Sequence, residues 1–291
     1  MIIVRLKGGL GNQLFQYAVG RHLAEIRQVV LKIDISFFET YTLHTYSMWP
    51  FDIQENFATR EEVMELATPK ESILDRFIGR VIPRPPKPAP TFIQEKYFHF
   101  DPNILSLPDN VYLDGHWQSE KYFANIKEII RREFTVKTPQ TGKDKELSEL
   151  IGSSESVSLH IRRGSYVFLP EANQTHGTCS MNYYYRCVDH LIKSIKNPHF
   201  FVFSDEPDWA RDNLKLAYPT TFVEHNSADK DYEDLRLMSQ CKHHIIANST
   251  FSWWGAWLSK NPGKIVLAPK KWFNKSKSDI KDLIPNSWYR I

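Results

Sequence analysis

The order in which short apolar runs, polar residues and helical patterns follow one another most constrains the fold of this chain. In Val157–Ile161 apolar and polar residues alternate, which predicts a strand. Phe200–Phe203 and His244–Ala247 predict further strands, and helical patterns separate the three. Because strands that alternate with helices usually form a parallel sheet, we expect a doubly wound α/β fold.

The first residues repeat this order around a glycine-rich turn. A compact apolar run, Met1–Leu6, precedes Gly8–Gln13, and a helical pattern and a second strand that ends at Asp34 follow. Gly9 and Gly11 let backbone N–H groups at a helix N-terminus approach an anion closely. The pattern is a dinucleotide fingerprint that lacks its third glycine, so a tight turn that binds no ligand is the alternative.

A length of 291 residues indicates two medium-sized domains rather than one. The polar stretch Thr135–Lys145, which contains Pro139 and Gly142, is the predicted linker. We therefore expect one domain at 1–145 and another at 146–291. Both are expected to be Rossmann-like and to face a cleft that suits two substrates.

Composition excludes several classes of protein. The formal net charge of +3 is too small to indicate nucleic acid as the main partner. No run of about 18 apolar residues occurs, so we expect no membrane-spanning helix. Ile2–Val4 reads as a strand, so we expect no secretory signal and a cytoplasmic location. The cysteines are odd in number, fit no zinc spacing and are expected to be reduced: Cys179, Cys187 and Cys241.

One segment combines basic and apolar side chains. Arg80, Arg84 and Lys87 stand beside apolar residues in and before a proline-rich connector, 83–90. A peripheral contact with the inner membrane is one interpretation of this segment, and a solvated loop is the other.

Polar side chains follow three of the strands predicted in the second half. They are His160, Arg162 and Arg163; Ser204 and Asp205; and Asn248, Ser249, Thr250 and Ser252. Because the carboxyl ends of parallel strands share one edge of a sheet, we expect these side chains to converge. Arginines and hydroxyls ahead of a helix are typical of a diphosphate site. Asp205 can accept two N–H bonds from a guanine, and Phe251 can stack on a base, so the sequence predicts a nucleoside-diphosphate ligand.

A metal site is the weaker interpretation. Asp229 and Asp231 form the one D-x-D pattern, just before a predicted helix, where acidic residues are favoured as caps. Arginines can neutralise the same negative charge as a metal ion, so we expect no metal.

Four segments in this order carry a resemblance to a known family: Gly8–Gln16, His160–Tyr166, Phe203–Asp205 and Asn248–Ala256. Together they resemble the bacterial α-1,2-fucosyltransferases of glycosyltransferase family 11, from near residue 3 to near residue 258. The chain departs from the family's H-x-R-R-x-D-Y motif at Ser165, where the family has an acidic residue.

The resemblance implies a GT-B-like fold, with an acceptor-side first domain and a GDP-fucose-binding second domain. It implies metal-independent, inverting transfer of L-fucose from GDP-β-L-fucose to the 2-hydroxyl of a terminal galactose on a glycan. The implied catalytic residues are Arg162, Arg163 and His160, with an arginine against the β-phosphate. The implied donor-binding residues are Gly9, Gly11, Asn12, Gln13, Asp205, Asn248, Ser249, Thr250, Phe251 and Ser252.

The acceptor side is less determined. Asp34, Asp114 and Glu120 lie at predicted element ends and are candidates for a general base, while His116 and Trp117 are candidate sugar contacts. Three alternatives remain open. They are a glycosyltransferase of another linkage or donor, a nucleotide-binding module without catalysis, and a nicotinamide oxidoreductase built on the glycine-rich turn.

Overall fold

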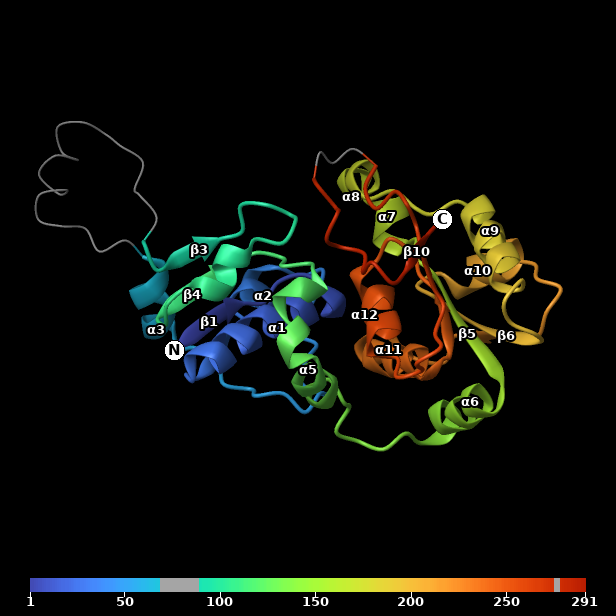
Figure 1. Ribbon diagram of the computed structural model, residues 1–291, viewed down its shortest axis with the longest axis horizontal. Coiled ribbons are helices and arrows are strands. Elements are labelled where there is room, and N and C mark those ends of the chain that lie inside the picture. The colour runs from blue at the N-terminus through green and yellow to red at the C-terminus, as the bar shows by residue number, and fades with distance from the viewer. Residues whose placement is uncertain (69–88, 275–277) are drawn as a thin grey trace, which may run out of the picture. The chain divides into compact units, whose positions relative to one another are not determined.

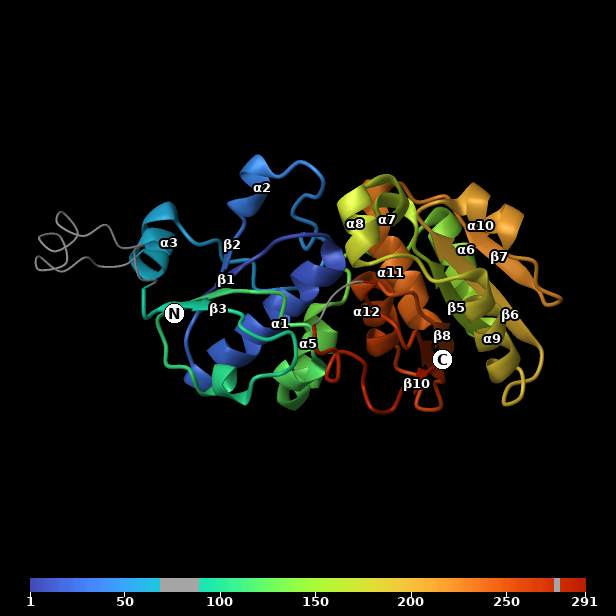
Figure 2. The same cartoon turned by 90° about the horizontal axis from the view of Figure 1, so that it is seen from above.

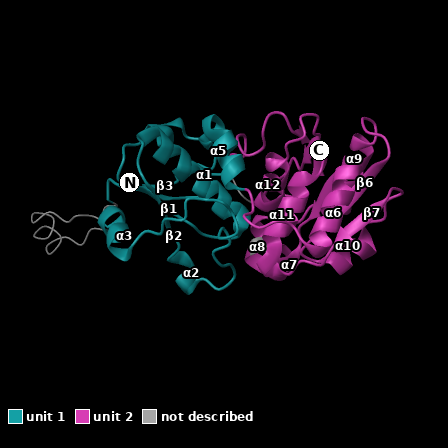
Figure 3. Ribbon diagram, turned by 90° about the horizontal axis from the view of Figure 1, so that it is seen from below, with its two compact units in different colours: residues 1–134 teal, residues 135–291 magenta. Residues whose placement is uncertain are grey.

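The computed structural model of the protein describes residues 1–68, 89–274 and 278–291. The chain divides into two compact units, Met1–Phe134 and Thr135–Ile291 (Figure 3). We predicted a boundary at 145, after a polar linker. Helix α6 (Gly142–Ser153) instead packs Leu147 and Ile151 in a core with residues of the second sheet, so the boundary lies earlier. The cleft expected between two domains stays a prediction.

The first unit contains a parallel sheet with the strand order β2-β1-β4-β3 (Figure 1). Its strands are β1 (Ile2–Arg5), β2 (Leu31–Asp34), β3 (Phe92–Gln94) and β4 (Val111–Asp114). Its α-helices are α1 (Leu10–Arg27), α2 (Phe37–Thr40), α3 (Arg60–Ala67) and α5 (Lys127–Glu133). Val4 pairs with Ile33 on one side and Leu113 on the other, so β1 is a central strand.

The predicted order of strand, glycine-rich turn, helix and strand is confirmed. Gly8 has φ +75°, a left-handed conformation that favours glycine, and Gly9 is the N-cap of α1. A Cβ at Gly20 would lie 3.1 Å from the Cβ of Val4, so α1 packs closely against β1. Thr59 as a cap, with Glu61 and Glu62 after it, predicts a helix over residues 61–66, and α3 confirms it and begins with a capping box.

Two other predictions for this unit fare differently. The sequence pattern from Tyr122 to Phe134 predicts one helix, but the structure has two short 3₁₀ segments, Glu120–Tyr122 and Ala124–Ile126, ahead of α5. Residues 73–82, whose sequence pattern predicts an amphipathic segment, and the proline-rich connector up to residue 88 lie outside the described residues.

The second unit contains a parallel sheet with the strand order β10-β9-β8-β5-β6-β7. Its strands are β5 (Glu155–Ile161), β6 (Pro198–Ser204), β7 (Thr220–Val223), β8 (His243–Ile245), β9 (Val266–Ala268) and β10 (Tyr289–Arg290). Its other helices are α7 (Gly164–Phe168), α8 (Pro170–Thr175), α9 (Met181–Leu191), α10 (Pro207–Asn213), α11 (Asp231–Gln240) and α12 (Thr250–Leu258).

Helices cover both faces of this second sheet. One core joins α9 and α10 to β5, β6 and β8, and a second core joins α6 and α11 to the opposite side chains of β6. Figure 1 shows α11 and α12 on one side of β5, with α9 and α10 on the other. The sequence did not predict α7 and α8, which lie side by side (Figure 1 and Figure 2). The expected α/β class with two parallel sheets is confirmed.

A helix that spans a membrane must be both long and apolar. In the described ranges of the chain, no helix is both long and apolar enough to span a bilayer.

Candidate active site

The strand order of the second sheet brings the predicted polar residues to one edge. Strand β5 lies between β8 and β6, and its register pairs His160 with Phe203 and Ile161 with Ser204. Arg162 and Asp205 therefore leave neighbouring parallel strands at the same level. Ligands of open α/β sheets bind outside this carboxyl edge, so it is the candidate active site.

Arg162 lies among ionisable and aromatic groups at this edge. Its Nη1 forms an ion pair with Oδ2 of Asp205 at 3.0 Å, and its guanidinium carbon lies 5.4 Å from the centre of the Tyr166 ring. The side chain remains 27% exposed. The charge of Arg162 also acts on Asp231. Burial is the main cause that raises the pKa of Asp231 to about 6, and the positive charge of Arg162 limits this rise. The surroundings can stabilise a cation and still admit solvent or a ligand.

Arg163 has different surroundings. Its backbone N–H donates to Oδ1 of Asp205 at 2.9 Å, and its Nε donates to Oε2 of Glu206 at 3.1 Å. The guanidinium carbon lies 3.6 Å from the centre of the Trp209 ring, at the start of α10. We predicted that an arginine, Arg162 or Arg163, lies against the β-phosphate, and this stays a prediction. In the structure both arginines pair with carboxylates, and Arg163 also contacts Trp209 of α10.

His160 is buried, with only 4% of its surface exposed. Burial, with a smaller effect of the Arg162 charge, lowers the pKa of His160 to about 3, so the imidazole is neutral. Its Nδ1 has no hydrogen-bond partner among the described residues, and its ring lies 5.8 Å from that of Phe251. A neutral imidazole can accept or donate a hydrogen bond here, but it supplies no positive charge.

Asn248 does not present its amide to the edge. The side chain is buried, and its Nδ2 lies 3.1 Å from three backbone carbonyl oxygens, of His176, Gly177 and Trp272. Its Oδ1 accepts a weak bond from the Sγ of Cys179 at 3.5 Å. These contacts fasten three chain segments together. The structure therefore favours a scaffolding role over the phosphate contact that the sequence predicted.

The first turn of α12 holds the other predicted phosphate ligands. Ser249 is the N-cap, and its hydroxyl accepts from the backbone N–H of Phe251 at 3.3 Å. Ser252 is buried and donates to the carbonyl oxygen of Ser249 at 3.4 Å. Thr250 and Phe251 are only partly buried. The two serines thus shape the turn, and a ligand can reach it at Thr250 and Phe251.

In the first unit, the glycine-rich turn is fastened by side chains of α1. The buried Gln13 donates to the carbonyl oxygens of Gly8 and Thr45, each at 2.8 Å, and accepts from the N–H of Ser47 at 2.9 Å. Gly11 is also buried. Gln13 therefore stabilises the turn, and its predicted contact with the donor stays a prediction.

Asn12 lies at the same turn but remains partly exposed. Its Oδ1 accepts from the Nε2 of Gln118 at 2.9 Å. A Cβ at Gly9 would lie 3.5 Å from the imidazole of His44, so that ring lies over the turn. The predicted contact of Gly9, Gly11 and Asn12 with the donor stays a prediction.

The acidic residues proposed for the acceptor side are already engaged. Asp34 accepts from the hydroxyl of Tyr112 at 2.5 Å and from the N–H of Ser36 at 2.8 Å. Asp114 pairs with Lys7 at 2.6 Å and with Arg5 at 3.3 Å. Glu120, the third candidate, begins a short 3₁₀ segment and is partly exposed.

Sequence reasoning missed a fourth carboxylate, Glu95, directly after β3. Its oxygens accept from the backbone N–H groups of His116 at 2.7 Å and Trp117 at 2.9 Å. Burial raises the pKa of Glu95, although these two bonds act in the opposite direction. The strand before it is short and only partly buried, so the sequence carried no signal for this position.

Trp117 cannot present its ring to a sugar, contrary to the prediction. Only 1% of the side chain is exposed, and it packs edge-on against Tyr122 with ring centres 5.7 Å apart. Its φ is +55°, a conformation that non-glycine residues rarely adopt outside constrained turns. His116, the other candidate, remains partly exposed.

The predicted alternatives for metal binding gain no support from geometry. Asp229 lies in an exposed 3₁₀ turn and accepts from the hydroxyl of Ser227 at 2.5 Å. In the part of the chain that the structure describes, no three His, Cys, Asp or Glu side chains are grouped as metal ligands.

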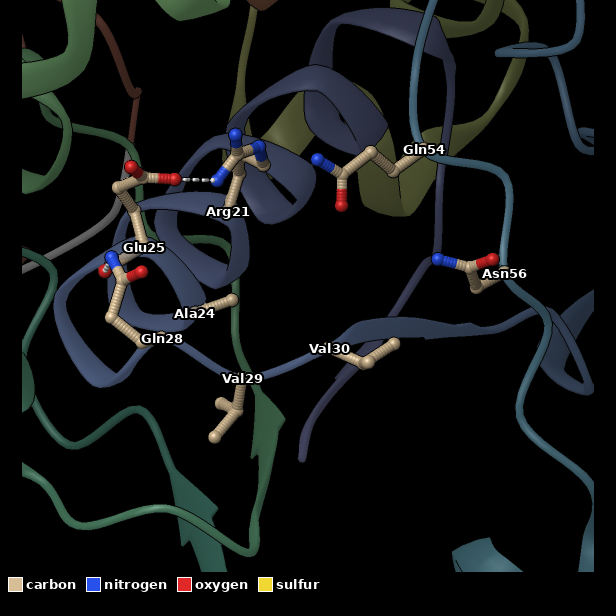
Figure 4. A pocket seen from close by; sticks show the side chains of 8 residues that line it. All are labelled: Arg21, Ala24, Glu25, Gln28, Val29, Val30, Gln54 and Asn56. Carbon is tan, nitrogen blue, oxygen red and sulfur yellow. Dashed lines mark hydrogen bonds and ion pairs between the residues drawn. The ribbon is translucent and has the colours of Figure 1, made fainter.

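A pocket of about 320 Å³ lies elsewhere, between the end of α1 and the start of β2 (Figure 4). Its buried cation, Arg21, is paired with Glu25 at 2.7 Å and Glu133 at 2.9 Å. The pocket lies near the amino end of β2, whereas ligands of such sheets bind at the carboxyl edge. We therefore do not assign the chemistry to it.

Comparison with known proteins gives a consistent result. The family model described as "Glycosyl transferase family 11" matches residues 1–291. An alpha-1,2-colitosyltransferase of Escherichia coli is 37% identical over 297 residues, covering 100% of this chain and 99% of that protein. A galactoside alpha-(1,2)-fucosyltransferase 1 of Mus musculus is 25% identical over 262 residues, covering 87% of this chain and 62% of that protein.

A solved structure supports the fold. The crystal structure of fucosyltransferase NodZ from Bradyrhizobium superposes with a TM-score of 0.51 at 16% identity, covering 90% of this chain and 96% of that one. The expected GT-B-like fold is confirmed by this likeness, which at such low identity concerns the fold alone.

Proposed function

The chain belongs to glycosyl transferase family 11, and from this membership we propose that it is a galactoside α-1,2-fucosyltransferase. It transfers L-fucose from GDP-β-L-fucose to the 2-hydroxyl of a terminal galactose on a glycan. The names of the Escherichia coli and Mus musculus relatives both specify α-1,2 transfer, which supports the linkage. The observation that carries the proposal is the position of Arg162, partly exposed at the carboxyl edge beside the first turn of α12.

The chemistry requires stabilisation of a leaving diphosphate. As the bond between the anomeric carbon and the β-phosphate oxygen breaks, negative charge grows on the diphosphate. The 2-hydroxyl oxygen attacks from the opposite face, inverting the anomeric carbon, and its proton leaves to a base or to water. Arg162 stabilises the growing charge more in the transition state than in the bound donor, which accelerates the reaction. The diphosphate binds beside the first turn of α12, where Thr250 and Phe251 are partly exposed and the positive end of the helix dipole favours an anion.

The two arginines have separate roles in this proposal. Arg162 contacts the β-phosphate, whereas Arg163 fixes the end of β5 through Glu206 and Trp209. The buried, neutral His160 adds a hydrogen bond to the donor without adding charge. Cationic arginine replaces a metal ion at the leaving group, so the reaction is metal-independent.

The acceptor binds at the carboxyl edge of the first sheet. Asp34 and Asp114 are engaged there by a tyrosine hydroxyl and by two cations. Among the described residues Glu95 accepts hydrogen bonds from two backbone N–H groups, and its raised pKa makes it a better proton acceptor than an ordinary carboxylate. We therefore add Glu95 to Glu120 as a candidate base.

The test includes a second donor, GDP-colitose, because the 37% identical relative is named for colitose. The experiment offers GDP-fucose and GDP-colitose to the purified chain with galactose-terminated and galactose-free acceptors, with and without EDTA, and reads the product by NMR. We expect an α-fucosyl unit on the 2-hydroxyl of galactose, at the same rate in EDTA. Transfer of colitose alone would show that the donor is GDP-colitose rather than GDP-fucose. A product with another linkage would contradict the proposed acceptor, the 2-hydroxyl of galactose. Thermal stabilisation by NAD but not GDP would favour the oxidoreductase alternative.

The proposal includes a cytoplasmic location with a peripheral contact with the inner membrane. The described cysteines are all unpaired, which suits a reducing compartment. The basic and apolar segment around Arg80 is the candidate membrane contact. Vesicle sedimentation with anionic lipids, with and without charge-removing changes at Arg80, Arg84 and Lys87, tests it.

A further inference from the structure

The carboxylate of Asp205 faces the end of β5 with both oxygens. Oδ2 forms an ion pair with Nη1 of Arg162 at 3.0 Å, and Oδ1 accepts a hydrogen bond from the backbone N–H of Arg163 at 2.9 Å. One oxygen therefore holds the side chain of the arginine proposed to act on the diphosphate, and the other holds the backbone that follows it. A carboxylate that recognises guanine must direct its oxygens at the N–H groups of the nucleobase. Here each oxygen of Asp205 already contacts a group of the protein.

Gly164 shows that this arrangement is built into the chain. A Cβ at position 164 would lie 2.2 Å from Oδ2 of Asp205 and 3.0 Å from its Cγ. A side chain there would displace the carboxylate or the turn. Three consecutive residues, Arg162 to Gly164, thus meet the same carboxylate, which makes it part of the turn rather than a mobile counterion.

The strand register explains why the partner comes from β6. Ile161 pairs with Ser204, so Asp205 follows β6 at the level where Arg162 follows β5. The segment His160–Tyr166 has no acidic residue of its own, because Ser165 stands where the resembled motif has one. The carboxylate that pairs with Arg162 is therefore supplied by the neighbouring strand.

An arginine side chain loses much conformational freedom when its guanidinium is held in one place. Asp205 holds it by an ion pair at 3.0 Å, with the centre of the Tyr166 ring 5.4 Å from the guanidinium carbon. We propose that Asp205 is a positioning residue that orients Arg162 toward the leaving diphosphate, and that it does not read the guanine. This proposal rests on the proposed role of Arg162.

The first test compares Asp205→Asn with wild type and with Asp208→Asn. The asparagine keeps an oxygen for the N–H of Arg163 but loses the charge that holds Arg162. Asp208 pairs with Arg211 on the exposed surface of α10 and serves as the matched control. For Asp205→Asn we expect kcat to fall at least tenfold, KM for GDP-fucose to change less than threefold, and the preference for GDP over ADP to persist. A kcat within twofold of wild type, or a lost preference for GDP, would overturn the proposal.

A second measurement needs no catalysis, so it separates failure of this proposal from failure of the proposed function. Phenylglyoxal modifies accessible arginines, and mass spectrometry gives the rate at each one. In Asp205→Asn we expect Arg162 to react several-fold faster than in wild type, and to be unchanged in Asp208→Asn, with circular dichroism confirming the fold. An unchanged rate at Arg162 in folded Asp205→Asn would show that Asp205 does not position it. Gly164→Ala, which displaces the same carboxylate, should raise the rate in the same way.

Discussion

Arg162 and Arg163 are adjacent in one sequence motif, but they contact different partners and therefore have different roles. Arg162 leaves β5 toward the carboxyl edge and keeps part of its surface exposed, whereas Arg163 turns to α10. The sequence predicts the end of the strand and the positive charge there. It does not predict the partners of the two arginines, because the pairing of β5 with β6 is what brings Asp205 and Trp209 close to them.

Arg163 is expected to contribute more to stability than to chemistry. Arg163→Ala removes a partly buried ion pair and a stacking contact on Trp209, which together stabilise the fold by about 1–2 kcal/mol. Urea unfolding should show that loss, while turnover of the folded variant stays within about tenfold of wild type. Unchanged stability combined with a turnover loss beyond a hundredfold would assign Arg163 to the leaving group instead.

At the scale of elements, the regular strands and helices were predictable and the irregular segments were not. The alternation in Val157–Ile161 and the cap at Thr59 are local signals, and both elements are present. Strand β3 and helices α7 and α8 are short and carry little periodicity, so they could not be predicted. For the same reason Glu95 was missed.

Two predicted site residues have buried side chains whose hydrogen bonds go to the protein backbone. Asn248 and Gln13 stand at strand or turn ends, where polar residues suggest ligand binding. Both side chains are buried, and their amides are used by backbone groups from distant parts of each unit. A sequence shows that an amide is present at a strand end, but only the fold shows which carbonyl oxygens it meets.

The start of α11 is expected to make stability depend on pH. Asp234 accepts from the Nδ2 of Asn226 at 2.8 Å, and Asp144, which accepts from His225, lies near it. Burial is the main cause that raises the pKa of Asp234 to about 7, above its ordinary 3.8. The folded state therefore favours neutral Asp234. This stabilisation is complete below about pH 4 and is lost as the pH rises through 7.

Asp234→Asn keeps an acceptor for Asn226 and removes the charge. Relative to wild type we expect no gain in the free energy of unfolding at pH 4, and a gain on the order of 2 kcal/mol at pH 8. Urea unfolding across this range measures the difference, and Asp208→Asn on the surface of α10 is the control. A gain that is the same at both pH values would contradict the assignment of a raised pKa.

At the scale of the whole molecule, two parallel sheets each present a polar carboxyl edge with its own chemistry. The first edge carries Asp34, Asp114 and Glu95 with Lys7 and Arg5, which suits an acceptor that must be oriented through its hydroxyls. The second edge carries the arginines and the first turn of α12.

The central claim is that the guanidinium of Arg162 stabilises the charge that the departing diphosphate acquires. Turnover of Arg162→Ala with GDP-fucose and a galactoside, measured beside wild type and beside unfolding curves of both proteins, tests it most directly. We predict a fall in kcat of about a hundredfold or more, the loss typical of a removed oxyanion donor, in a protein that unfolds like wild type. A folded Arg162→Ala protein whose kcat stays within a few-fold of wild type would contradict it.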